Sequence, residues 1–164
     1  MDPAQTYVRV AASRSPDTAE VEDDLVAAMR GFEPTVILLF AGGGTRISDL
    51  SSRLLRRYPD ALIAGCTTCG EIGPDGITSG AVSALALAAP ARARACLVED
   101  LDRFRFEDGK AVIQDLQDRM GVDAGTLADQ GHDFVLLTLT DGLSGMEEIL
   151  ITSLATYAPG VPLI

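Results

Sequence analysis

Three short polar segments hold most of the residues whose chemistry could support a function. Each segment is rich in glycine and follows an apolar run of the kind that forms a buried strand. The candidate site residues are Gly43, Gly44, Thr45, Arg46, Gly65, Cys66, Thr67, Thr68, Gly70, Glu71, Asp141, Gly142 and Ser144. If their strands are parallel, all three segments emerge at one edge of the sheet, where α/β proteins bind ligands.

The residue types in these segments suit a small charged ligand. Glycine loops that lead into helices present free backbone N–H groups, which attract carboxylates and phosphates. Arg46, Glu71 and Asp141 could pair with a ligand's carboxylate and amine, or could serve as local caps. The glycines could also do no more than form tight turns. Neither a P-loop nor a G-x-G-x-x-G fingerprint is present in the sequence, so ATP and dinucleotide sites are not expected.

Cys66 and Cys69 form a C-x-x-C pair, which opens a redox or hydrolytic alternative. Glycines and a proline follow at once, whereas a thioredoxin-like site needs a helix there to lower the thiol pKa. Cys96 and His132 do not complete a zinc site with this pair. His132 is the one histidine, predicted at the surface, with a single axial haem ligand as the alternative. We therefore expect no catalytic residues, no metal and no cofactor, with haem as the exception to test.

Composition and net charge exclude several classes of partner and location. The 164 residues carry a net charge of -11 with a pI near 4.3, which disfavours nucleic acid and anionic membranes as partners. Three cysteines, an odd number, argue against a disulfide framework. The sequence shows neither a secretory signal at residues 1–6 nor a long uncharged apolar run, so a cytoplasmic protein is expected.

The elements that would position these residues alternate along the chain. Strands are predicted at 7–12, 35–41, 61–64, 81–89, 93–98 and 134–140. Helices are predicted from Ser15 to about residue 32, from Thr45 or Ser48 to about residue 58, over 107–120, and from Ser144 onward, with a loop at 121–131. Strands 81–89 and 93–98 would form an antiparallel hairpin turning at Pro90. The prediction is an α/β layered sandwich with a mostly parallel mixed sheet plus this hairpin.

Residues 1–6 are expected to form a short or disordered N-terminal segment, and residues 7–164 one α/β domain. Val161–Ile164 has the pattern of a buried strand that has just begun. The pattern predicts that the chain is the N-terminal half of a longer protein, the alternative being a short edge strand that completes the domain.

The segment from Ala61 to Ile72, ALIAGCTTCGEI, resembles the signature of FIST domains, in which an apolar strand runs into Gly-Cys-Ser/Thr-Thr-x-Gly-Glu-Ile. The apolar run and glycines of 36–44, the alanine-rich stretch 81–89 and Asp141-Gly142 agree with it in order. The resemblance extends from about residue 8 to residue 164. Cys69 occupies the variable position, which weakens the redox alternative.

This resemblance implies an N-terminal FIST domain followed by a C-terminal FIST half. It implies a sensory role in bacterial signal transduction, beside a histidine kinase or a cyclic-di-nucleotide enzyme. Amino acids or related small metabolites are the implied ligands, and haem is associated with some members. Gly65, Cys66, Thr67, Thr68, Gly70 and Glu71 match the signature. A haem-based gas sensor, a Cys66-dependent enzyme and an interaction scaffold remain the alternatives.

Overall fold

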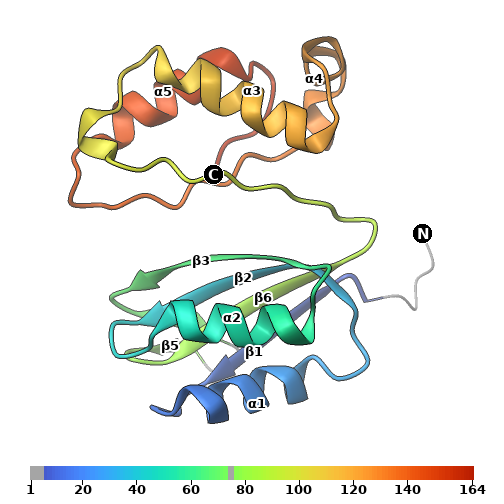
Figure 1. Cartoon of the computed structure of the whole chain (residues 1–164), viewed down its shortest axis with the longest axis vertical. Helices are drawn as coiled ribbons and strands as arrows, with labels where there is room; N and C mark the ends of the chain where they lie inside the picture. Colours follow the sequence, from blue (N-terminus) through green and yellow to red (C-terminus); the bar gives the residue numbers. More distant parts are fainter. Residues whose placement is uncertain (1–5, 74–75) are drawn as a thin grey trace. The chain divides into compact units, whose positions relative to one another are not determined.

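The computed structural model describes residues 6–73 and 76–164. The chain divides into two compact units, residues 1–93 and residues 94–164, which are described separately below (Figure 1). Residues 1–5, most of the predicted N-terminal segment, lie outside the described residues.

The first unit contains a four-stranded sheet with the strand order β1-β6-β2-β3. Its strands are β1 (Val8–Ser13), β6 (Val82–Ala88), β2 (Pro34–Gly42) and β3 (Leu62–Thr68). Strands β2 and β3 pair in parallel, whereas β6 is antiparallel to both β1 and β2. The predicted α/β fold with a mixed sheet is confirmed. Parallel pairing does not predominate as expected, because β6 is inserted between two strands that run the same way.

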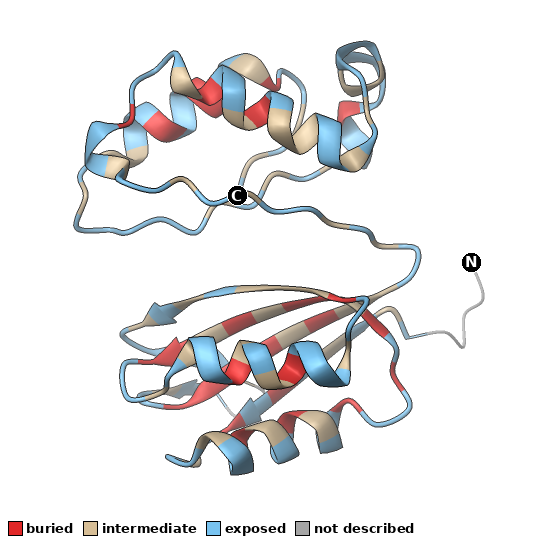
Figure 2. Ribbon diagram, viewed as in Figure 1, coloured by how far each residue is buried: buried red, intermediate tan, exposed pale blue. Residues whose placement is uncertain are grey.

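Helices α1 (Thr18–Ala28) and α2 (Ile47–Arg57) cover one face of this sheet, as Figure 1 shows. Their buried residues face the strands (Figure 2). The core they enclose contains Ala11, Val21, Leu25, Met29, Phe32, Ile37, Leu39, Ala41, Leu50, Leu54, Ala61, Val82, Ala84 and Ala86. The buried residues Val21 and Leu25 of α1, and Leu50 and Leu54 of α2, recur at the four-residue spacing of a helix with one apolar face.

Helix α1 begins later than predicted. Asp17 is its N-cap, and its side chain accepts hydrogen bonds from the N–H groups of Ala19 and Glu20. The Ser15 hydroxyl accepts the Asp17 N–H at 3.0 Å and donates to Glu20 at 2.6 Å. Ser15 is therefore not the N-cap residue but accepts a hydrogen bond from it. The Asp17 carboxylate is the better cap here, because it accepts hydrogen bonds from two free backbone N–H groups at once.

Strand β3 continues four residues beyond its predicted end, through Thr68. Its pairing with β2 persists from Leu39 opposite Gly65 to Gly42 opposite Thr68, so four of the seven residues from Gly65 to Glu71 lie in β3. A two-stranded antiparallel sheet follows, formed by β4 (Glu71–Gly73) and β5 (Gly76–Thr78). Residues 74–75, which connect these two strands, lie outside the described residues.

The second unit is built on two packed helices, α3 (Asp108–Met120) and α5 (Glu147–Tyr157). Its buried core residues are Phe104, Ile113, Leu150, Leu154 and Ala158. The helices approach closely where the Ser153 hydroxyl donates to the carbonyl of Phe106, because Gly109 has no side chain to keep them apart.

Four expectations for the second unit are corrected. Residues 93–98 form no strand: Arg119 donates to the Ala95 carbonyl at 3.1 Å, so this stretch is held to α3 by side chains. The predicted loop 121–131 contains helix α4 (Ala124–Gln130), capped by Asp123, followed by the short turn η2 (Gly131–Asp133). The predicted strand 134–140 makes one isolated parallel bridge, Leu136 to Leu163. Ser144 does not cap α5, whose N-cap residue is Met146.

A further short turn, η1 (Leu101–Arg103), precedes α3. Within residues 6–73 and 76–164, no helix combines the length and the apolar character that crossing a membrane requires.

Candidate functional site

Two of the three predicted segments meet at one edge of the first unit's sheet. Because β2 and β3 are parallel neighbours, residues 43–46 and 69–70 both follow carboxyl ends of strands. Gly42 and Thr68, the last residues of the two strands, are paired directly. The structure therefore brings Gly43, Gly44, Thr45 and Arg46 beside Thr67, Thr68 and Gly70. This is the edge at which α/β sheets bind ligands.

The segment after β2 is a tight turn with an exposed backbone. The Gly42 N–H donates to the Ala81 carbonyl at 2.8 Å, and the Thr45 N–H donates to the Gly42 carbonyl at 3.0 Å. Gly43 and Gly44 are exposed, and a Cβ on either would meet nothing within 4 Å. Open space next to two glycine backbones lets a ligand approach the main chain closely.

Arg46 precedes α2 and carries the positive charge of this segment. Its side chain is 82% exposed and pairs with Asp49 at 3.1 Å. The first turn of α2 receives no side-chain cap from Arg46, and α2 begins directly after the segment that follows β2. A guanidinium beside uncapped helix N–H groups suits a carboxylate.

Gly65 lies within β3 and is required by close packing. A Cβ on Gly65 would stand 2.8 Å from the Cβ of Leu39 and closer still to the Leu39 carbonyl oxygen. The sequence pattern predicted that Gly65 belongs to a ligand-binding loop. Its position opposite Leu39 shows that any larger side chain would separate β2 from β3.

Cys66 is half-buried on β3, paired in register with Phe40. Burial raises the pKa of the Cys66 thiol above its ordinary value. A raised pKa leaves less thiolate at neutral pH, which is the opposite of what nucleophilic or redox cysteines need. Cys69 follows β3 and is exposed, and neither cysteine lies at a helix start. The structure gives no support to the cysteine-based alternative.

Glu71 is 1% exposed and is buried between two parts of the sheet. Its Oε1 accepts the Thr68 hydroxyl at 2.7 Å, and its Oε2 accepts the Ala81 N–H at 2.9 Å. The carboxyl group thus joins the end of β3 to the start of β6. In the sequence, Glu71 is a single acidic residue among glycines. That pattern does not show whether the carboxylate contacts a ligand or accepts hydrogen bonds from the protein itself.

The third predicted segment belongs to the second unit. The Asp141 side chain accepts the Leu143 N–H at 2.9 Å, and the Ser144 hydroxyl accepts the Met146 N–H at 3.3 Å. Both side chains form local turns before α5, in the manner of Asx and Ser turns. Asp141 and Gly142 are exposed, and Ser144 is half-buried.

His132 lies in η2 with its side chain 78% exposed, 3.6 Å from Asp133. Across the described residues, the histidine, cysteine and acidic side chains form no cluster of three or more that could hold a metal ion.

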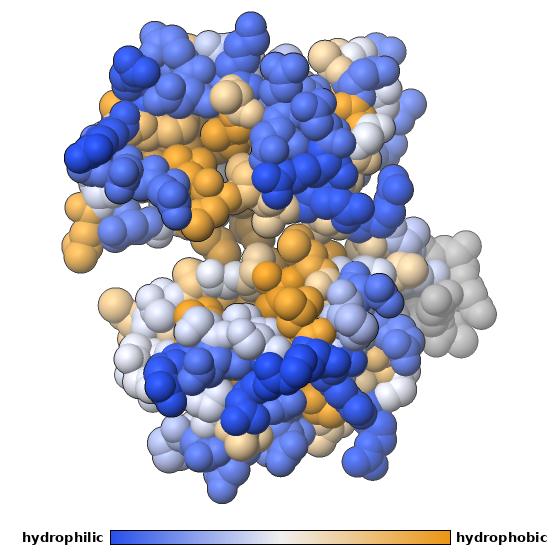
Figure 3. All heavy atoms as spheres, in the orientation of Figure 1, coloured by the Kyte–Doolittle hydropathy of each residue, from blue (hydrophilic) through white to orange (hydrophobic). Residues whose placement is uncertain are grey.

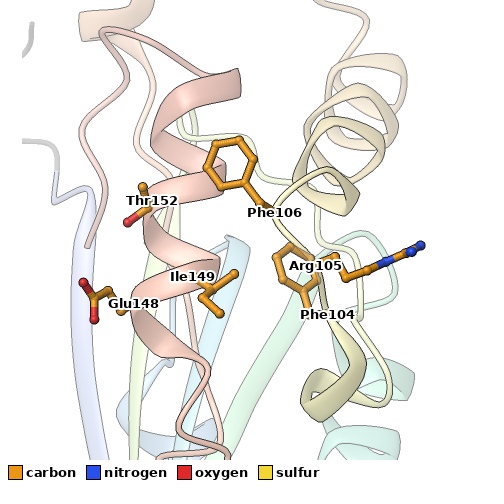
Figure 4. A pocket seen from close by; sticks show the side chains of 6 residues that line it. All are labelled: Phe104, Arg105, Phe106, Glu148, Ile149 and Thr152. Carbon is orange, nitrogen blue, oxygen red and sulfur yellow. The ribbon is translucent and has the colours of Figure 1, made fainter.

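A depression of about 450 Å³ on the second unit was not anticipated from the sequence. Phe104, Arg105 and Phe106 line one side, and Glu148, Ile149 and Thr152 of α5 line the other (Figure 4). Apolar side chains also gather at the surface of this unit in Figure 3. Two sequence features could have indicated this depression: the alternating Phe-Arg-Phe segment and the apolar residues on the outer face of α5. None of the predicted site residues lies here.

Comparison with known proteins gives one family. A search of curated proteins found no match. The sequence matches the FIST N domain over residues 35–164, a stretch that contains all three predicted segments and runs through both units. The match covers most of the chain and agrees with the signature from Ala61 to Ile72, so the chain belongs to the FIST N domain family.

Proposed function

We propose that this chain is a small-ligand sensory domain that binds an amino acid or a related small carboxylate at the edge formed by the ends of β2 and β3. FIST domains are a family of sensor domains associated with signalling, which supports the sensory part of the proposal. The observation that carries the location is the parallel pairing of Gly42 with Thr68, which places two exposed polar segments side by side.

The chemistry of this edge favours a ligand carboxylate. Arg46 supplies a guanidinium, the start of α2 supplies N–H groups, and Gly43 and Gly44 supply open backbone. Thr67 is exposed on β3 and supplies a hydroxyl. Glu71 is not free to meet a ligand, because both of its oxygens accept internal hydrogen bonds. We assign Glu71 the role of holding the edge in shape.

The output of such a sensor would pass to other parts of a signalling system. A C-terminal FIST half and a histidine kinase or cyclic-di-nucleotide enzyme are the partners we propose, on the strength of the family alone. The net charge of -11 supports protein and small-molecule partners over nucleic acid.

A thermal-shift screen against the twenty amino acids and small dicarboxylates tests the proposal. A ligand at about 100 times its Kd stabilises the folded protein by about 2.7 kcal/mol, which raises the Tm by about 5 °C. Arg46→Ala should weaken binding of the active compound by about tenfold to a hundredfold, since it removes a charged hydrogen bond. Arg30→Ala is the matched control, because Arg30 lies before the start of β2, at the opposite end of that strand. A flat response from a folded protein would contradict the proposal.

A further inference from the structure

The depression on the second unit keeps large apolar side chains at the surface. Phe106 is 37% exposed, and Ile149, on the facing side of the depression in α5, is 41% exposed. Phe104 also lines the depression and is buried. Apolar area that stays in contact with water gains free energy when another surface covers it.

The two sides of the depression are held together within the second unit. The Ser153 hydroxyl of α5 donates to the backbone carbonyl of Phe106. The Phe106 ring also packs against the Tyr157 ring, with the two ring centroids 5.8 Å apart. The exposed apolar surface is therefore already in place, and a partner would not have to order it on binding.

Opposite charges stand on the two flanks of this apolar surface. In Figure 4, the Glu148 carboxylate points out on one side and the Arg105 guanidinium on the other, with Phe106 and Ile149 between them. The Arg105 side chain is 78% exposed, and its Nε lies 3.7 Å from the Asp108 carboxylate. Glu148 is exposed and forms no ion pair with any residue among 6–73 and 76–164.

A surface with one positive flank, an apolar middle and one negative flank is complementary to itself. In a dimer whose two-fold axis runs along the depression, each flank faces the opposite flank of the second copy. Arg105 of each copy then meets Glu148 of the other, and the apolar side chains between them cover one another. A partner of a single charge sign would oppose one of the two flanks, so the charges favour a second copy.

We infer that this depression is a self-association surface, at which two copies of the chain meet with Arg105 of each opposite Glu148 of the other. It is separate from the proposed ligand site, because its residues belong to α5 and to the segment before α3. The net charge of -11 on each chain opposes association at low salt. At about 0.15 M salt, that repulsion is screened beyond about 8 Å, whereas contacting pairs are screened less.

Sedimentation of the whole chain at this salt concentration tests the inference. We expect a concentration-dependent dimer between about 1 μM and 1 mM protein, the range of a small, transient interface. Arg105→Glu or Glu148→Arg should weaken the dimer by about tenfold or more, since like charges then face each other at two symmetric places. The double variant exchanges the two charges and should restore dimerisation.

Matched reversals outside the depression separate this contact from the change in net charge. Arg92→Glu and Glu99→Arg alter the net charge by the same amounts at exposed positions and should leave the dimer unchanged. A monomer at every concentration would overturn the inference and leave the depression to a different protein partner. A dimer that neither single reversal weakens, or a double variant as weak as the single ones, would overturn it as well.

Discussion

Oε2 of Glu71 accepts a hydrogen bond from the backbone N–H of Ala81 at 2.9 Å, and both residues are buried. Glu71 is the first residue of β4, and Ala81 lies ten positions further along the chain, after β5. Glu71 is the one buried acidic or basic side chain among the residues that the structure describes. A buried charged group is retained only where its hydrogen bonds are satisfied, and here Thr68 and Ala81 satisfy them.

Glu71→Ala should lower the free energy of unfolding by about 2–3 kcal/mol, because the Ala81 N–H would remain buried without an acceptor. Urea unfolding followed by circular dichroism measures this loss. Glu33→Ala, an exposed acid of the same unit, should change stability by no more than about 0.5 kcal/mol. Equal stability of the two variants would mean that the hydrogen bonds of Glu71 do not stabilise the fold.

Gly65→Ala should destabilise the first unit by about 1–3 kcal/mol, since the added methyl overlaps Leu39 and must push β3 away from β2. Gly43→Ala is the matched control, because a Cβ there meets nothing within 4 Å. Thermal unfolding of both variants gives the comparison. A Gly65→Ala protein as stable as the Gly43→Ala protein would contradict the close packing described for β3.

Gly109→Ala should destabilise the second unit by a similar amount, about 1–3 kcal/mol, because the new methyl collides with the Ser153 hydroxyl between α3 and α5. Gly142→Ala, in the same unit and in open space, should be neutral. Hydrogen exchange of the α3 and α5 amides locates the effect. Unchanged protection of these helices in the Gly109→Ala protein would be the contrary result.

Cys66 should be a slow nucleophile at neutral pH. Burial raises the pKa of its thiol above the ordinary value of 9.0, so the unfolded thiol ionises first as the pH rises. The folded state consequently loses stability above about pH 9 and is unaffected by this group below it. In a protein that keeps Cys66 alone, iodoacetamide alkylation should reach half its maximal rate above pH 9. A midpoint near 7 would revive the enzyme alternative.

The regular elements of the first unit were readable because their patterns are strong. The run from Val36 to Ala41 is apolar throughout, which is typical of a strand inside a sheet, and α2 repeats its apolar residues at Leu50 and Leu54. The relative direction of β6 was not readable, because an alanine-rich strand carries no mark of parallel or antiparallel pairing.

Other features depended on contacts distant in sequence. The stretch 93–98 has a strand-like composition, yet Arg119 of α3 provides its hydrogen bond at Ala95. Helix α4 has too few apolar residues to show a helical period, and the Asp123 cap was its one local signal. The burial of Glu71 follows from the position of Ala81, which no local pattern around Glu71 specifies.

The most direct test of the account is a map of backbone amide shifts in the isotope-labelled protein on addition of the compound that gives the largest thermal shift. The account predicts saturable changes at residues 43–47 and 67–70, and their loss in the Arg46→Ala protein. Saturable changes centred on other residues, with those two segments unmoved, would contradict a ligand site at the ends of β2 and β3.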